Sequence, residues 1–233
     1  MSNSNLSMIN KIWFSPLNVI YHFKRLESEG KITPDKKFYK KTCEAFVTAI
    51  SLIGIIKMIG REYWMQIVDD SERSPDVRTG CYDRKTKDND FSWQDVEVVT
   101  YDSNSSEGLV DFLLRTKLSS DKAYDELTTI LCHINKVAQI PPIQELNQQL
   151  LAKNPKIKSP VIILGKVDPE KEIYRMAQIY PTIDLDLTFD PIAECKAKKY
   201  NGVLVLNRSA KGTIESTHNP DEKHYPFENL GLI

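Results

Sequence analysis

The stretch Ser74–Tyr101, SPDVRTGCYDRKTKDNDFSWQDVEVVTY, decides the fold prediction for this chain. Apolar and polar residues alternate after Pro75-Asp76 and again over the last seven residues, which predicts two strands joined by a charged turn. Alternation puts Asp95 and Glu97 on one face of the second strand, and an adjacent strand can bring Asp76 close to them. Three carboxylates that converge at a strand end suit Mg²⁺, which binds hard oxygen ligands and keeps waters that can become nucleophiles.

Around this stretch, hydrophobic spacing predicts an alternation of helices and strands. Such an order indicates βαβ units, and therefore an α/β fold with a central mixed, largely parallel sheet flanked by helices. The segment 62–68 is predicted as a strand or the edge of a helix. Helices are predicted over 18–29, 34–59, 106–118, 143–152, 169–180 and 191–199, and further strands over 127–134, 161–167, 183–189 and 202–206.

We expect an N-terminal helical extension over residues 1–35, one α/β domain over 36–210 and an irregular C-terminal tail over 211–233. The 233 residues are 41% hydrophobic with a net charge of -1, which is typical of a globular protein without a global field for nucleic acid. Two lysine runs offer local basic faces that either follow a phosphate backbone or form the solvated sides of helices. These runs are Lys36, Lys37, Lys40, Lys41 and Lys196, Lys198, Lys199.

The cysteines and the N-terminus indicate a cytoplasmic protein. The four cysteines are far apart and show no CxxC spacing, which favours reduced thiols over a zinc site. The first ten residues lack the basic and apolar regions of a signal peptide. The apolar segment Ala49–Ile59 is too short to span a bilayer, so we expect a buried helix and no membrane contact.

The order helix, two strands, helix, strand, with acids on the first helix and on both strands, resembles the restriction-endonuclease-like superfamily of PD-(D/E)xK nucleases. The resemblance covers roughly residues 36–136 and rests on Glu44, Pro75-Asp76 and Asp95-Val96-Glu97. It implies a restriction-endonuclease-like core in which Asp76 and one or both of Asp95 and Glu97 bind Mg²⁺ or Mn²⁺. It also implies that Glu44 reaches the metal through a water.

The chain departs from the family pattern at the lysine that orients the attacking water. That lysine is expected two residues after the strand acid. This position holds Glu97 if the acid is Asp95, and Val99 if the acid is Glu97. Some members of the superfamily have an acid at this place, and others take a lysine from the next helix. The resemblance therefore implies either Glu97 itself or Lys117, with Arg115 close by, in this role.

Other interpretations of the same residues stay open. Proline-aspartate is a common turn, and Asp-x-Glu on a strand is often the solvated face of an edge strand. A second ExK string (Glu-x-Lys), Glu194-Cys195-Lys196, follows Asp184 and Asp186. The residues after Asp190 are good helix formers, so we expect a helix capped by Asp190 in which Glu194 and Lys196 point to different sides. Trp64 and Trp93 either stack on a base or pack at the core edge, and His133 in an apolar strand is typical of a core histidine.

Two classes of function follow. The first is a Mg²⁺-dependent nuclease that cleaves phosphodiester bonds in DNA, in restriction or genome defence, with the carboxylates holding the metal. The second is a non-catalytic α/β module that binds a protein or nucleic-acid partner through a degenerate nuclease-like fold. The sequence leaves open whether the chain works as a homodimer or as one subunit of a larger assembly, as small α/β proteins with local basic runs often do.

Overall fold

The structure is a computed structural model of the whole chain. It describes residues 12–36, 38–68, 75–83, 90–119, 128–135, 141–156, 159–168, 170–197, 203–208, 214–219 and 225–228. Two sets of predicted features lie outside the described residues. The first is the charged turn predicted between the first two strands, and the second is three lysines of the basic runs, Lys37, Lys198 and Lys199.

The chain divides into two compact units, which we call the first unit (residues 1–93 and 197–233) and the second unit (residues 94–196). These units group the chain differently from the predicted segments 1–35, 36–210 and 211–233. Strand β1 (Ile12–Phe14) pairs with both β2 (Tyr63–Ile67) and β9 (Val203–Arg208), so the N-terminal segment and the late strands belong to the same unit.

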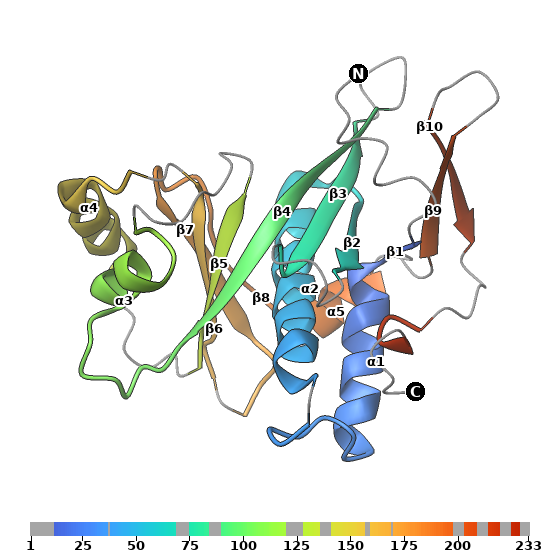
Figure 1. Cartoon of the computed structure of the whole chain (residues 1–233), viewed down its shortest axis with the longest axis horizontal. Coiled ribbons are helices and arrows are strands. Elements are labelled where there is room, and N and C mark those ends of the chain that lie inside the picture. Colours follow the sequence, from blue (N-terminus) through green and yellow to red (C-terminus); the bar gives the residue numbers. More distant parts are fainter. Residues whose placement is uncertain are drawn as a thin grey trace. The chain divides into compact units, whose positions relative to one another are not determined.

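The strands of the first unit follow the order β10-β9-β1-β2-β3 and pair antiparallel throughout (Figure 1). Here β3 is Val77–Asp83 and β10 is Ile214–Asn219. The expectation that the C-terminal tail is irregular is wrong over β10, because its backbone pairs with β9 along six residues.

Two helices, α1 (Pro16–Ser28) and α2 (Tyr39–Ile59), pack together in the first unit (Figure 1). Ser15 caps α1 by accepting a hydrogen bond from the Asn18 backbone N–H at 3.1 Å, as serine commonly does before a helix. The rings of Phe23 and Phe46 stack between the helices with their centroids 3.9 Å apart. This contact buries the apolar stripe that the helical spacing predicts.

Helix α2 begins at Tyr39, five residues later than predicted. Thr33 does not cap it: its carbonyl accepts from the Lys36 N–H at 2.9 Å in a separate turn. The helix ends at Gly60, whose φ of 69° is a left-handed conformation that glycine adopts without strain. By length and composition α2 is the one described helix that could cross a membrane, but 67% of its apolar 18-residue window is buried, as is typical of the core helix of a soluble protein.

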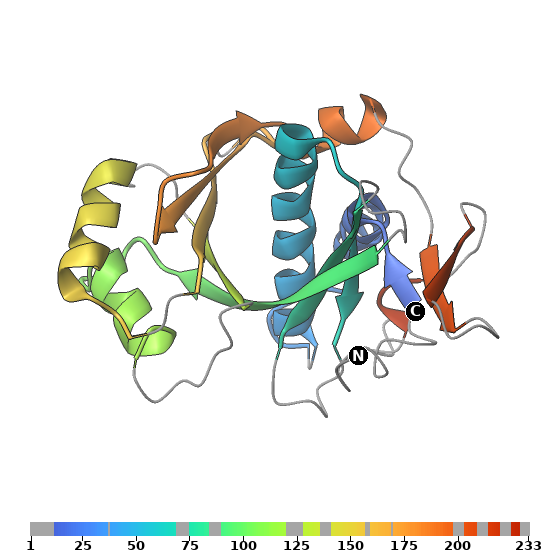
Figure 2. The same cartoon turned by 90° about the horizontal axis from the view of Figure 1, so that it is seen from above.

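The second unit is a five-stranded sheet in the order β4-β5-β6-β7-β8. Its strands are β4 (Asp90–Tyr101, whose first residues belong to the first unit), β5 (Thr129–Ile134), β6 (Val161–Lys166), β7 (Tyr174–Tyr180) and β8 (Asp186–Phe189). Strands β4, β5 and β6 are parallel, and the other two pairings are antiparallel. Helices α3 (Leu109–Thr116) and α4 (Ile143–Lys153) share a core with one face of this sheet (Figure 2).

The prediction of a largely parallel sheet is wrong, because most of the described strand pairings are antiparallel. Part of the error lies in β7, whose residues were predicted as a helix over 169–180. Its sequence contains good helix formers, but Tyr174, Met176 and Ile179 are all at most 3% exposed between β6 and β8. Burial of both faces of a strand overrides the local preference of the chain.

Gly80 in β3 lies where the β4 segment of the first unit approaches too closely for a side chain. A Cβ at this position would lie 2.3 Å from Cζ of Phe91, and the Phe91 ring is itself packed 4.9 Å from the ring of the fully buried Trp13. We expect Gly80→Ala to lower the free energy of unfolding by about 1–3 kcal/mol in urea titrations. The double variant Gly80→Ala/Phe91→Leu should recover part of that loss; no recovery would contradict the steric explanation.

Candidate functional site

In the second unit, the structure brings the predicted acid Glu97 together with the predicted lysine Lys117. Glu97 lies on β4 opposite Ile130 of β5, on the sheet face that α3 covers. Lys117 is the C-cap of α3, where its backbone N–H donates to the Leu113 carbonyl at 2.9 Å. Its Nζ lies 2.6 Å from Oε2 of Glu97, and the two side chains are only 14% and 9% exposed. The result is a short, largely desolvated ion pair.

Asp95 shares the strand face of Glu97, as alternation along β4 requires. Its side chain is half-buried, and its Oδ1 atom is shielded from solvent. The expectation of a solvated edge-strand face therefore does not describe these two acids. Arg115 points elsewhere: it forms two hydrogen bonds, of 2.9 and 2.7 Å, with the carboxylate of Glu107. Of these two cations, Lys117 is thus the one that contacts a strand acid, Glu97.

In the first unit, Glu44 on α2 and Asp76 before β3 form a second acidic pair. Glu44 is 7% exposed. Its burial and the negative charge of Asp76 raise its pKa to about 7, although Lys40 and Lys41 act in the opposite direction. Lys40 Nζ lies 3.3 Å from a Glu44 oxygen, but its side chain is 87% exposed, so solvent screens the pair. A carboxyl whose pKa is raised mainly by burial, and further by a neighbouring acid, is found often at functional sites.

The donor chemistry of these residues fits a hard divalent cation. Carboxylate oxygens are the ligands that Mg²⁺ prefers, and a cation near Glu44 and Asp76 would offset both the burial and the repulsion by Asp76 that raise the Glu44 pKa. Within the part of the chain that the structure describes, there is no group of three or more His, Cys, Asp or Glu side chains arranged around one metal position. The residues supply the ligand type, and a cation would need waters to complete its coordination.

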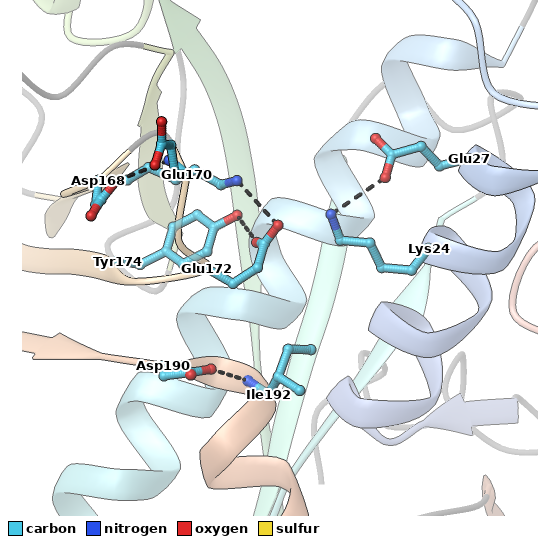
Figure 3. Close-up of polar contacts among 9 residues, drawn as sticks. Lys24, Glu27, Asp168, Glu170, Glu172, Tyr174, Asp190 and Ile192 are labelled. Atoms are coloured by element: carbon cyan, nitrogen blue, oxygen red, sulfur yellow. Dashed lines mark hydrogen bonds and ion pairs between the residues drawn. The ribbon is translucent and has the colours of Figure 1, made fainter.

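The other candidate residues have structural partners. Asp186 of the second ExK string is held by Arg175 through hydrogen bonds of 2.9 and 2.8 Å. Asp190 caps α5 (Pro191–Ala197) as predicted, accepting from the Ile192 backbone N–H at 2.9 Å (Figure 3). Figure 3 also shows Glu172, which accepts from Lys166 at 3.1 Å and from the Tyr174 hydroxyl at 3.0 Å beside the β6–β7 connection. These contacts explain the acids without a ligand.

The degree of burial also decides what several single residues can do. Trp64 is 2% exposed, so it packs in the core and does not present its ring for stacking on a base. Burial lowers the pKa of His133 to about 4 and raises that of Cys132 to about 12, so both side chains are neutral at pH 7. In the first basic run Lys41 is buried, whereas Lys40 is highly exposed. The side chains of the second run lie outside the described residues.

A cavity of about 500 Å³ in the second unit was missed by the sequence analysis. It lies where β4 and β5 end, at Tyr101 and Ile134, and is bordered by the β4–α3 loop and by α4. The one sequence signal was the polar run from Asp102 to Ser106, which lies between the predicted strand ending at Tyr101 and the helix predicted over 106–118. In the structure Asp102 and Ser105 do accept backbone hydrogen bonds from Asn104 and Glu107, while the serines also line the cavity.

Comparisons of the chain with protein-family models, with curated proteins and with solved structures gave no match.

Proposed function

We propose that this protein is a Mg²⁺- or Mn²⁺-dependent nuclease that cleaves phosphodiester bonds in DNA, in a restriction or genome-defence role. The observation that carries the proposal is the 2.6 Å contact between Lys117 and Glu97, the lysine and the acid that the sequence resemblance singles out in different elements. The acidic pair Glu44 and Asp76, with the raised pKa of Glu44, supports it independently.

In this proposal the carboxylates of Asp95 and Glu97 in the second unit, and that of Asp76 in the first unit, would provide hard oxygen ligands for Mg²⁺ or Mn²⁺, and Glu44 would accept a hydrogen bond from a water bound beside Asp76. The bound cation supplies Lewis acidity and lowers the pKa of that water. Lys117 contributes a positive charge that stabilises the negative charge developing on the phosphate oxygens. Its largely buried position strengthens that electrostatic effect, because solvent screens it less.

The test is cleavage of plasmid and single-stranded DNA by the purified protein with Mg²⁺ or Mn²⁺. We expect cleavage in the wild type and a loss of at least ~100-fold in Asp76→Asn, Glu97→Gln and Lys117→Met. Asp184→Asn is the matched control, since Asp184 is exposed in the second unit and belongs to the rejected ExK string. It should keep wild-type activity.

Metal binding provides a second readout. Mg²⁺ or Mn²⁺ should raise the melting temperature of the wild type, and Asp76→Asn should abolish the rise while Asp184→Asn keeps it. A wild type that neither cleaves DNA nor is stabilised by metal would overturn the nuclease proposal. The alternative, a non-catalytic α/β module that binds a protein or nucleic-acid partner, would then account for the fold.

A further inference from the structure

The cavity of the second unit lies at the carboxyl ends of two neighbouring parallel strands. Loops that follow the strands of a sheet often carry binding residues, because the rigid sheet holds them in place. The volume of about 500 Å³ falls within the range of small-molecule sites, roughly 300–1,000 Å³. All of its lining residues belong to the second unit.

The inner wall of the cavity is apolar and ordered by the core. Val110, Ile134 and Leu146 are between 1% and 5% exposed and line it together with Pro141. The ring of Tyr101 forms part of the wall, and its hydroxyl donates to the Glu107 carbonyl at 2.7 Å. Because this hydroxyl is engaged and the ring also contacts the Phe112 ring, with centroids 5.2 Å apart, the tyrosine is held in a fixed position beside the cavity.

The outer border is polar but carries little net charge. Ser103, Ser105, Ser106 and Gln149 place hydroxyl and amide groups around the opening. Of the two acids there, Glu107 is neutralised by Arg115 at 2.7 Å and Asp111 is paired with Lys153 at 3.5 Å. With these charges compensated, the border favours hydrogen bonding to a neutral ligand over attraction of an ion.

We propose that this cavity binds an uncharged ring compound with several hydroxyl groups, of the nucleoside class. The heteroaromatic ring would pack against the apolar wall and Tyr101, and the sugar hydroxyls would bond with the serines and Gln149. The proposal rests on the second unit alone and does not depend on nuclease activity.

The test is isothermal titration of the full chain with adenosine, guanosine, cytidine and uridine. We expect at least one of them to bind saturably, and inorganic phosphate and ribose to bind at least tenfold more weakly. Ala152→Trp should weaken nucleoside binding at least tenfold, since Ala152 is an exposed lining residue of α4 and the larger side chain would fill the opening. Gln148→Trp is the matched control, because Gln148 is exposed on the same helix and does not line the cavity.

Three results would overturn the proposal. The first is no binding of any of the four nucleosides, and the second is phosphate binding as tightly as the best nucleoside. The third is equal affinity of the wild type and Ala152→Trp, which would place the binding elsewhere. Melting curves of both tryptophan variants check that the second unit is folded, and Ser106→Ala gives a second variant of the border with little risk to folding.

Discussion

Lys117→Met is expected to lower the free energy of unfolding by ~2–4 kcal/mol at pH 7. The substitution removes the cation that lies 2.6 Å from Glu97 and leaves a carboxylate whose side chain is only 9% exposed without that partner. Taking one member from a largely buried ion pair is costly, because the remaining charge has lost its solvation and its partner together. Urea titrations of the wild type and the variant measure the loss.

Lys153→Met is the matched control for this prediction. Lys153 also pairs with an acid, Asp111, but at 3.5 Å with both side chains more than half exposed, so its removal should change stability by less than ~0.5 kcal/mol. The double variant Glu97→Leu/Lys117→Met should be more stable than Lys117→Met, because the buried carboxylate is removed together with the lysine that lies 2.6 Å from it. Equal losses in Lys117→Met and Lys153→Met would show that burial of the first pair has no energetic weight.

Glu44 is expected to make the protein lose stability as the pH rises. Its pKa is about 7 in the folded protein and 4.5 as the unperturbed value, so the folded state binds more protons than the unfolded state between these pH values. The contribution of this group is therefore fully present below about pH 4.5 and is lost as the pH rises through about 7. The rise in pKa corresponds to a free energy of about 3 kcal/mol.

Unfolding free energies of the wild type and Glu44→Gln between pH 4.5 and 8.5 measure this effect. The difference in stability between the two proteins should shift by ~3 kcal/mol in favour of Glu44→Gln across that range. Glu170→Gln, which changes an exposed glutamate before β7, should run parallel to the wild type. A pH-independent difference for Glu44→Gln would contradict the raised pKa, and added Mg²⁺ should reduce the wild-type loss if the acids bind metal.

Local patterns were sufficient for most elements of the fold. The helical spacing over 18–29 and the strand alternation over 95–101 correspond to α1 and to the later part of β4. Each signal depends on a short run of residues and on one face being buried. By contrast, Tyr174–Tyr180 has helix-forming residues but pairs as a strand, which no local pattern could reveal.

In the candidate site too, local patterns predicted the residue types but not their contacts. The sequence identified Glu44, Asp76, Asp95, Glu97 and Lys117 as an acidic set with one accompanying lysine. It could not state which acid the lysine contacts, because Glu97 and Lys117 are 20 residues apart and meet only when α3 packs on β4 and β5. The buried environment of Glu44 likewise arises from the packing of the first unit.

The sequence by itself determined an α/β protein, the position of α1, β4 and α3, and the residues that carry charge near the strand ends. The tertiary structure decided the antiparallel majority of the strand pairings, the strand identity of β7 and β10, the Glu97–Lys117 pair and the cavity beside Tyr101. The physical reason is range: side-chain periodicity is a property of neighbours along the chain, whereas strand pairing, burial of a charge and the space left between elements depend on residues that only folding brings together.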